Sequence, residues 1–174
     1  LAIVGIIFIM FTKDEKKKDI GGIFLGFAIL MYGMEAMSGA VAPLADNEKF
    51  TGILTMFSNP ILGLLAGTIL TAVIQSSSAS VGILQALCAT GAVNFSTALP
   101  IIMGQNIGTC VTAIISSIGT SKNAKRAAAV HLFFNISGTV IFMVVFYTLN
   151  TFVHFSFLNT AASPAGIAVI HSLF

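Results

Sequence analysis

Long apolar runs alternate with short polar or charged segments along this chain. A helix needs about 20 mostly apolar residues to cross a bilayer, and the runs at residues 20–44, 97–118 and 127–153 reach that length. Inside a bilayer every backbone polar group has to be hydrogen-bonded within the protein, which a helix achieves by itself. The pattern therefore predicts an all-α integral membrane protein.

The apolar sequence between residues 58 and 94 is different, because a polar stretch divides it. The first arm, Ile61–Ile74, covers only about two thirds of a hydrocarbon core of ~30 Å at a rise of ~1.5 Å per residue. The second arm, Val81–Ala89, is shorter still, and Gln75–Ser80 lies between the two. We expect these arms to form a re-entrant helical hairpin that enters and leaves the membrane on the outer side, with its polar tip at mid-membrane depth.

A second polar segment interrupts the run at residues 97–118. It spans Gly104–Thr109, reads Gly-Gln-Asn-Ile-Gly-Thr, and is followed by Thr112 one turn later. Two glycines that bracket a pair of amide side chains are typical of a discontinuous membrane helix, in which unwound backbone lines a binding site. The sequence therefore predicts a broken transmembrane helix here.

Charged residues make up only 8% of the chain, whereas soluble domains contain about 25%. Apart from Glu35, they cluster at residues 13–19, 46–49 and 122–126, and residues 50–121 contain none. The positive-inside rule places the lysine-rich first and third clusters in the cytoplasm. We therefore expect a multi-pass protein of the cell (inner) membrane, surrounded by the lipid bilayer. No basic face is available for nucleic acid, and the two cysteines have no metal-binding spacing.

These runs and clusters divide the chain into five parts of one membrane domain. Because the chain begins inside one apolar run and ends inside another, we expect it to be a fragment of a longer protein. The expected parts are 1–19, the end of a preceding helix and a cytoplasmic loop; 20–57, a transmembrane helix and an interfacial helix; 58–94, the re-entrant hairpin; 95–121, the broken transmembrane helix; and 122–174, the following transmembrane helix and the start of the next.

The chemistry of the polar tip favours small ions. Three consecutive serines at a helix break offer hydroxyl and carbonyl oxygens, which a hard cation such as sodium prefers. An oxyanion needs the opposite, convergent N–H and O–H donors at the positive end of a helix dipole. The second arm begins near Ser77 and directs its N-terminus at the tip, so one site can hold an anion beside a cation. We interpret the tip as the binding site of an ion-coupled transporter.

Several short motifs follow one another along the chain in an order that resembles a known protein family. Gln75–Ala79 reads Gln-Ser-Ser-Ser-Ala, Gly104–Thr109 follows it, and Ala128–Asn135 contains an Ala-x-x-His-x-x-Phe-Asn pattern. Upstream, Tyr32–Ser38 and the Asn-Pro pair at 59–60 match as well. In this order the motifs resemble the type II sodium-phosphate cotransporter family in its bacterial form, over nearly the whole chain.

The resemblance implies two inverted repeats, each with its own Gln-Ser-Ser-Ser hairpin, that enclose one substrate site. This chain contains one such motif and resembles the second repeat, so the missing first repeat of the same protein, or a second copy, is the implied partner. The implied activity is sodium-coupled transport of inorganic phosphate by alternating access, with Na+ as the coupling ion and no enzymatic residues. The implied phosphate contacts are Gln75, Ser76, Ser77 and Asn106. The implied sodium contacts are Gln75, Ser76, Ser78, Gln105, Thr109 and Thr112.

Three other functions compete with this interpretation. A sodium-coupled carboxylate carrier also uses serine-rich hairpin tips, although the chain lacks an intramembrane Arg or Asp pair. A non-transporting membrane subunit would bind a regulatory partner through the loop at residues 13–18. An intramembrane serine hydrolase would need Ser77 as nucleophile with His131 as base, but the sequence has no Gly-x-Ser-Gly type elbow.

Overall fold

The structure, a computed structural model, describes residues 1–45, 47, 49 and 56–174. Residues 46, 48 and 50–55 lie outside the described residues, and with them most of the charged cluster at 46–49 and of the end of the 20–57 part, where the interfacial helix was expected. Every regular element among the described residues is a helix, accompanied by an isolated antiparallel bridge between Asn94 and Ala161. The all-α prediction is thus confirmed. The chain forms two compact units, Leu1–Ala40 and Val41–Phe174.

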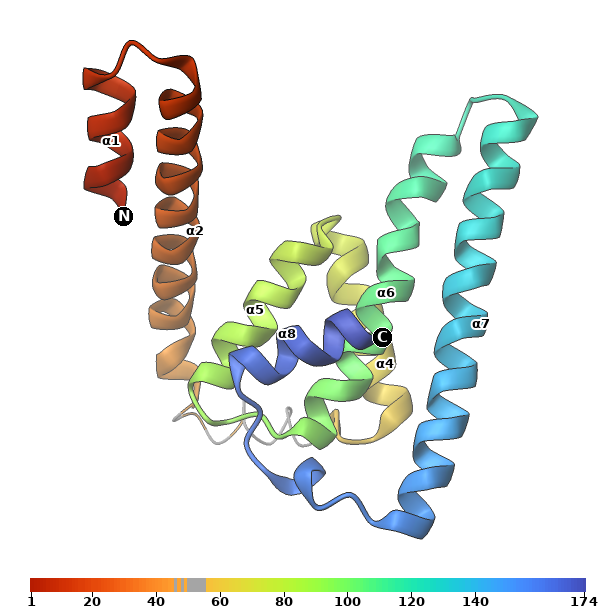
Figure 1. Cartoon of the computed structure of the whole chain (residues 1–174). Coiled ribbons are helices and arrows are strands. Elements are labelled where there is room, and N and C mark those ends of the chain that lie inside the picture. The colour runs from red at the N-terminus through yellow and green to blue at the C-terminus, as the bar shows by residue number, and fades with distance from the viewer. Residues whose placement is uncertain (46, 48, 50–55) are drawn as a thin grey trace. The chain divides into compact units, whose positions relative to one another are not determined.

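The first unit is a pair of helices, α1 (Ala2–Phe11) and the first part of α2 (Glu15–Ala45) (Figure 1). The two helices come closest at two glycines. A Cβ on Gly5 would lie 2.7 Å from the carbonyl oxygen of Gly21, and one on Gly21 would lie 2.8 Å from the carbonyl oxygen of Gly5. Small residues that let backbones touch are a common basis for helix pairing in membranes.

The second unit contains two short helices followed by two long ones. The short helices, 15 and 13 residues long, are joined by Gln75 and Ser76 and form a helical hairpin. A short 3-10 helix then packs against the first of the two long helices, and a last helix folds back against the second arm of the hairpin (Figure 1). The bounds are α4 (Pro60–Ile74), α5 (Ser77–Ala89), α6 (Phe95–Ser117), α7 (Lys122–Val153), η1 (Ser156–Asn159) and α8 (Pro164–Leu173).

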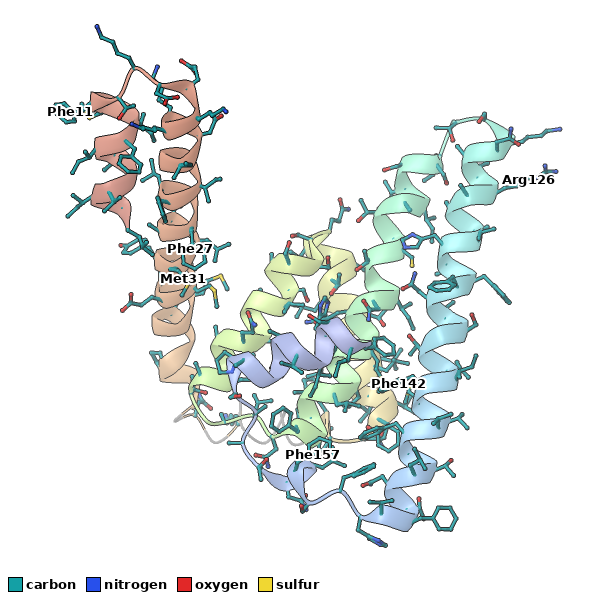
Figure 2. All side chains as sticks on the ribbon, in the orientation of Figure 1. Phe11, Phe27, Met31, Arg126, Phe142 and Phe157 are labelled. Atoms are coloured by element: carbon teal, nitrogen blue, oxygen red, sulfur yellow. The ribbon has the colours of Figure 1, made fainter. Side chains whose placement is uncertain are left out.

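Three helices among the described residues are long and apolar enough to cross a membrane, namely Glu15–Met37 within α2, α6 and α7. Large apolar side chains cover surfaces that no protein segment occupies. Phe11 on α1 and Phe152 on α7 are each 79% exposed, and Figure 2 shows Phe11, Phe27 and Met31 projecting from the first unit. Contiguous apolar surface of this kind marks a contact with membrane or with further protein.

Helix α4 packs on α6 through glycines that bring the two backbones together. Gly63 and Gly67 on α4 and Gly104 and Gly108 on α6 are all buried. A Cβ on Gly67 would collide with the carbonyl oxygen of Ile101, and a Cβ on Gly108 would lie 2.6 Å from the carbonyl oxygen of Thr68. The contact therefore has no room for side chains at these four positions, and it holds the first arm of the hairpin directly on the spanning helix.

This packing also explains why one prediction is wrong. Helix α6 continues without interruption from Phe95 to Ser117, so the expected break at Gly104–Thr109 does not occur. The two glycines provide the space in which α4 lies rather than a point of unwinding. The Thr109 hydroxyl donates to the Gln105 carbonyl oxygen at 2.9 Å, as expected within an intact helix.

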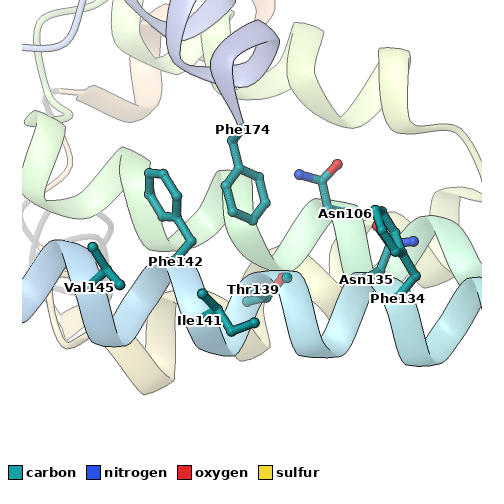
Figure 3. A pocket seen from close by; sticks show the side chains of 9 residues that line it. Asn106, Phe134, Asn135, Thr139, Ile141, Phe142, Val145 and Phe174 are labelled. Carbon is teal, nitrogen blue, oxygen red and sulfur yellow. The ribbon is translucent and has the colours of Figure 1, made fainter.

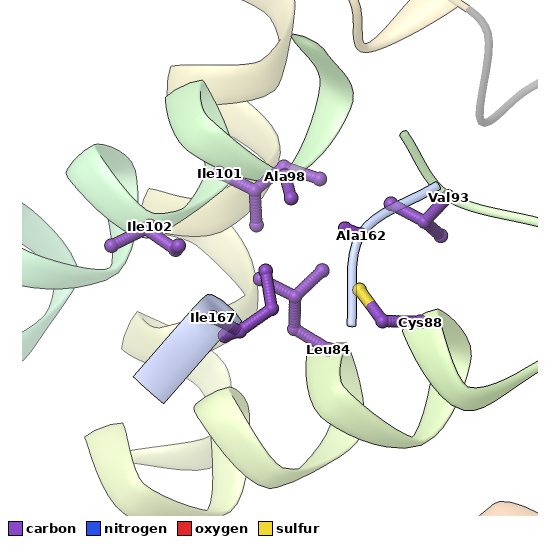
Figure 4. Close-up of a cluster of buried hydrophobic side chains, with 8 residues drawn as sticks. All are labelled: Leu84, Cys88, Val93, Ala98, Ile101, Ile102, Ala162 and Ile167. Atoms are coloured by element: carbon purple, nitrogen blue, oxygen red, sulfur yellow. The ribbon is translucent and has the colours of Figure 1, made fainter. Parts of the chain in front are cut away.

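A small apolar core joins the hairpin to the C-terminal segment. Ala162 N donates to Val93 O at 2.8 Å and Phe95 N donates to Thr160 O at 3.1 Å, which seats the segment before α8 against the start of α6. Buried side chains from α5, α6, α8 and the segments that precede α6 and α8 then pack around this junction (Figure 4). They are Leu84, Cys88, Val93, Ala98, Ile101, Ile102, Ala162 and Ile167. The second arm of the hairpin is thereby fixed on α6 and α8.

Candidate functional site

The predicted polar tip is a two-residue reversal between α4 and α5 (Figure 1). Gln75 ends α4 in a left-handed conformation (φ 57°, ψ 24°), and its N–H donates to Thr71 O at 2.7 Å. Ser76 is extended and caps α5, because its Oγ accepts a hydrogen bond from Ala79 N at 3.3 Å. Left-handed backbone is unfavourable for a residue other than glycine. The two caps therefore hold Gln75 in a costly conformation that reverses the chain within two residues.

The first turn of α5 presents hydrogen-bond donors at this reversal. The leading N–H groups of a helix have no intrahelical acceptor, and they carry the positive end of the helix dipole. Ser77 and Ser78 occupy these positions, and the hydroxyls of Ser76 and Ser78 lie 3.5 Å apart. No acidic residue occurs in this turn. Such a group of donors suits an oxyanion.

A buried hydrogen-bond network connects the two arms of the hairpin to α6. Thr71 Oγ1 donates to Ser80 Oγ at 2.8 Å, and Gln105 Nε2 donates to the same oxygen at 3.0 Å. All three side chains are fully buried. Thr71 lies in the last turn of α4 and Ser80 in the first turn of α5, so three helices meet at one hydroxyl. Since leaving a buried polar group unpaired costs about 1–3 kcal/mol, the network stabilises the hairpin on α6.

The amide oxygen of Gln105 takes no part in this network. Gln105 Oε1 is buried and has no hydrogen-bond partner. One turn further along α6, Thr109 Oγ1 donates its proton to Gln105 O and keeps its lone pairs. Within the part of the chain that the structure describes, no three His, Cys, Asp or Glu side chains form a group. Any cation held at this face of α6 would therefore bind neutral oxygens.

The structure divides the predicted site residues between two faces of α6. Gln105 joins the hairpin, whereas Asn106 lines a pocket with residues of α7 such as Asn135 and Thr139, and none of the tip residues lines that pocket. Neighbouring residues on a helix point about 100° apart, which accounts for the division. Of the predicted residues, Gln105 is buried; Ser76, Ser77, Asn106 and Thr109 are half-buried; and Gln75, Ser78 and Thr112 are exposed.

Two residues of the network, Thr71 and Ser80, were not among the predicted site residues. Ser80 belongs to the polar stretch and Thr71 to the end of the first arm, but both lie inside helices rather than at the reversal. A signal was available, because each is four residues from the reversal, Thr71 before Gln75 and Ser80 after Ser76. That spacing places a side chain on the same helix face as the tip residue one turn away.

Comparison with known proteins adds a family match. The model of a family described as Na+/Pi-cotransporter matches residues 29–163. The protein YqeW of Bacillus subtilis is 32% identical over 142 residues, which cover 81% of this chain and 46% of that protein. The putative inorganic phosphate export protein YjbB of Escherichia coli is 26% identical over 144 residues, covering 82% and 26%. The sodium-dependent phosphate transport protein 2A of Rattus norvegicus is 39% identical over 113 residues, covering 62% and 17%.

The chain therefore spans less than half the length of these curated relatives. No solved structure matches it.

Proposed function

The chain belongs to the Na+/Pi-cotransporter family, and from this premise we propose that it supplies one half of the substrate site of a sodium-coupled transporter of inorganic phosphate. Membership confirms the resemblance stated from the motifs. It also confirms that the chain is a membrane protein, in agreement with its three helices of spanning length. The family and two of the named relatives, the Escherichia coli and Rattus norvegicus proteins, are named for phosphate transport or export, which confirms that the chain is not an enzyme.

Phosphate is proposed to bind at the tip of the hairpin. The supporting observation is the start of α5, where Ser77 and Ser78 place unpaired N–H groups and hydroxyls at the positive end of a helix, without an acidic side chain in that turn. Ser76 adds a hydroxyl. Gln75 lies beside it at the end of α4, and its side chain is exposed. Gln75, Ser76 and Ser77 are therefore the proposed phosphate contacts.

Sodium is proposed to bind between the tip and α6. The supporting observation is Gln105 Oε1, a buried oxygen that has no hydrogen-bond partner. The amide nitrogen of the same side chain donates to Ser80 Oγ. Thr109 adds a hydroxyl oxygen one turn away and Thr112 follows along the helix. Together with oxygens of Gln75, Ser76 and Ser78 they complete the proposed sodium set. A cation held there would offset part of the charge of a phosphate at the neighbouring helix end.

The other half of the site is proposed to come from a first, inverted repeat of the same protein or from a second copy of this chain. Gln75 and Ser78 are exposed, so the tip has an open side that another hairpin would cover. The two arms would extend about 20–22 Å at ~1.5 Å per residue, less than a hydrocarbon core of ~30 Å. These lengths support a re-entrant hairpin, and two such hairpins facing each other support alternating access.

The direction of net transport has a second candidate. A relative from Escherichia coli is named as a phosphate export protein, and a sodium-coupled carrier can run either way according to its gradients. Proteoliposomes loaded with labelled phosphate on one side, with sodium imposed on the inside or the outside, separate the two cases. Sodium-driven uptake supports import, and sodium-independent efflux supports export.

Sodium-dependent uptake of labelled phosphate by the full-length protein in proteoliposomes tests the proposal. We expect Ser77→Ala and Gln75→Ala to reduce uptake by at least about ten-fold, because each removes a group that would contact a charged ligand. Ser172→Ala is the matched control, since this exposed hydroxyl on α8 donates to Ala168 O within its own helix.

Wild-type uptake in both tip variants would contradict the proposed phosphate contacts. Competition separates phosphate from the rival substrate class: unlabelled phosphate should abolish uptake of the label, and a dicarboxylate at the same concentration should leave it intact. Strong inhibition by the dicarboxylate would favour a sodium-coupled carboxylate carrier instead.

A further inference from the structure

A pocket lies on another face of α6 from the hairpin, between α6, α7 and Phe174, the residue that follows α8. It has a volume of about 370 Å3, and Figure 3 shows the side chains around it. Its lining includes Asn106, Phe134, Asn135, Thr139, Phe142 and Phe174. None of the residues proposed to contact phosphate at the tip, Gln75, Ser76 and Ser77, lines it. The pocket is therefore a separate feature of the molecule.

Thr139 is the unusual residue of this pocket. It is only 1% exposed, and its Oγ1 has no hydrogen-bond partner. Thr109 on α6 and Thr151 on α7, in contrast, give their hydroxyl proton to the carbonyl oxygen four residues earlier, that of Gln105 and of Tyr147 respectively. A buried hydroxyl without that bond carries a cost, which a bound ligand would remove.

The other two polar side chains of the pocket are amides. Asn135 Nδ2 donates to His131 O at 2.9 Å, which leaves the amide oxygen of Asn135 as its second polar atom. Asn135 and Thr139 are four residues apart and so lie on one face of α7, opposite Asn106 of α6. The pocket thus brings neutral oxygens from two helices to one place.

One buried polar atom without a partner belongs to a residue of the pocket lining. Among the described residues, the buried side-chain atoms without a partner are Gln105 Oε1 on α6, Thr139 Oγ1 on α7 and His171 Nε2 on α8. Of these three residues, Thr139 lines the pocket, whereas Gln105 and His171 do not. Buried polar groups in proteins are nearly always hydrogen-bonded, so the unpaired Thr139 hydroxyl points to a ligand in the pocket.

The chemistry of the lining indicates which ligand. No Lys, Arg, Asp or Glu side chain lines the pocket, so an oxyanion would find no compensating charge and a divalent cation no carboxylate. Hard cations bind hydroxyl and amide oxygens, and a monovalent one has the smallest charge to compensate. We infer that this pocket is a sodium site, with Asn106, Asn135 and Thr139 as its ligands, distinct from the sodium site at the hairpin. The inference rests on the proposed sodium coupling.

Sodium binding and sodium activation of phosphate uptake, measured on the full-length protein, test the inference. Thr139→Val removes the hydroxyl at nearly constant shape, and we expect it to raise the half-saturating sodium concentration by about ten-fold, as loss of one contact to a charged ligand does. Thr139→Ser retains the hydroxyl and should remain within about two-fold of wild type. Thr151→Val is the matched control, because the Thr151 hydroxyl bonds only to its own helix.

A second pair of variants keeps the test valid if Thr139→Val fails to fold. A Cβ on Gly138 would meet nothing within 4 Å, and Gly138 lines the pocket. Gly138→Leu should fill the pocket and weaken sodium binding. Gly26→Ala is the control that should bind sodium normally, because a Cβ on Gly26 would also meet nothing within 4 Å and Gly26 does not line the pocket. Equilibrium binding of radioactive sodium in the absence of phosphate supplies a readout that does not depend on transport.

The outcomes separate this inference from the proposed function. Sodium affinity unchanged in Thr139→Val and in Gly138→Leu, with sodium-dependent uptake intact, would overturn the second sodium site alone. A change in the half-saturating phosphate concentration at saturating sodium, without a change in sodium affinity, would overturn it as well and assign the pocket to the anion. A wild-type protein that neither binds sodium nor needs it for transport would overturn both proposals.

Discussion

Replacing Gly104 by alanine should separate α4 from α6, although it adds a single methyl group. The added Cβ would fall on the carbonyl group of Leu64 and lie 2.9 Å from Thr68 N, both backbone atoms of α4. Comfortable carbon contacts lie at about 3.5–4.0 Å, so the two helices have to move apart by roughly 0.5–1 Å or more. Backbone atoms have no rotamers through which to avoid the methyl group.

The expected cost follows from what that separation removes. A gap of about 0.5–1 Å forfeits a quarter to a half of the dispersion energy of each contact. It also lengthens the hydrogen bond from Thr68 Oγ1 to Gly104 O, now 3.1 Å, and strains the bond from Gln105 to Ser80, now 3.0 Å. Overpacking of about 1–3 kcal/mol and one weakened buried hydrogen bond of about 1 kcal/mol together predict a loss of about 2–4 kcal/mol.

Gly26→Ala is the matched control for Gly104→Ala. A Cβ on Gly26 of α2 would meet nothing within 4 Å, and alanine is favoured over glycine inside a helix by about 0.5–1 kcal/mol. Denaturant or thermal unfolding of the two variants in the same detergent should therefore shift in opposite directions. Equal stability of Gly104→Ala and Gly26→Ala would refute the claim that the α4–α6 contact is made by the backbones.

Three further changes have defined outcomes. Ser80→Ala should lower the free energy of unfolding by about 2–4 kcal/mol, because it leaves two buried donors without their acceptor. Thermal unfolding measures this loss, with Ser172→Ala as the control, and equal melting temperatures of the two variants would contradict the network. Gln75→Gly should stabilise the protein by about 1 kcal/mol by relieving left-handed strain while lowering phosphate uptake, so a variant that loses stability would show that the reversal is unstrained. Asn59→Ala should lower the free energy of unfolding by about 1 kcal/mol, because the Asn59 side chain caps α4 by accepting hydrogen bonds from the backbone N–H groups of Ile61 and Leu62. An unfolding curve identical to that of the wild type would contradict this role of the cap.

Local sequence signals predicted much of the hairpin. Pro60 after Asn59 marks the start of α4, and the serines after Gln75 mark the start of α5, because capping depends on neighbours in the chain. The length of each apolar run likewise depends only on the sequence. The structure begins α4 at Pro60 and α5 at Ser77, as these signals indicate.

The glycines of α6 were misinterpreted because their local pattern has two physical meanings. Gly104 and Gly108 are compatible with an unwound segment and equally with a groove for another helix. The second meaning depends on a partner, and Gly63 and Gly67 on α4 have the same spacing of four residues. Matching pairs of this kind in two helices favour close packing, a relation that appears only when the helices are considered together.

The pocket beyond α6 could not be predicted from the sequence. It depends on Asn106, Thr139 and Phe174 meeting from three different helices, and no local spacing relates these positions. The Gln-Ser-Ser-Ser motif, in contrast, is contiguous and indicated the tip directly. A site formed by residues that are neighbours in the chain can be predicted from the sequence, whereas a site formed by residues from different helices can be recognised only from the three-dimensional structure.

The glycine contact between α4 and α6 has a consequence for motion during a transport cycle. The glycines recur every four residues, about 6 Å along each helix. Carbonyl groups of the opposite helix lie against Gly67, Gly104 and Gly108, and the Pro100 side chain lies against Gly63. Sliding one helix by a single residue, about 1.5 Å, would bring larger side chains such as Ile101 or Leu64 against the facing backbone. The pair therefore has one permitted register and should travel as a rigid body. We expect the moving joints to lie elsewhere, where side chains rather than backbones meet, as between α6 and α7.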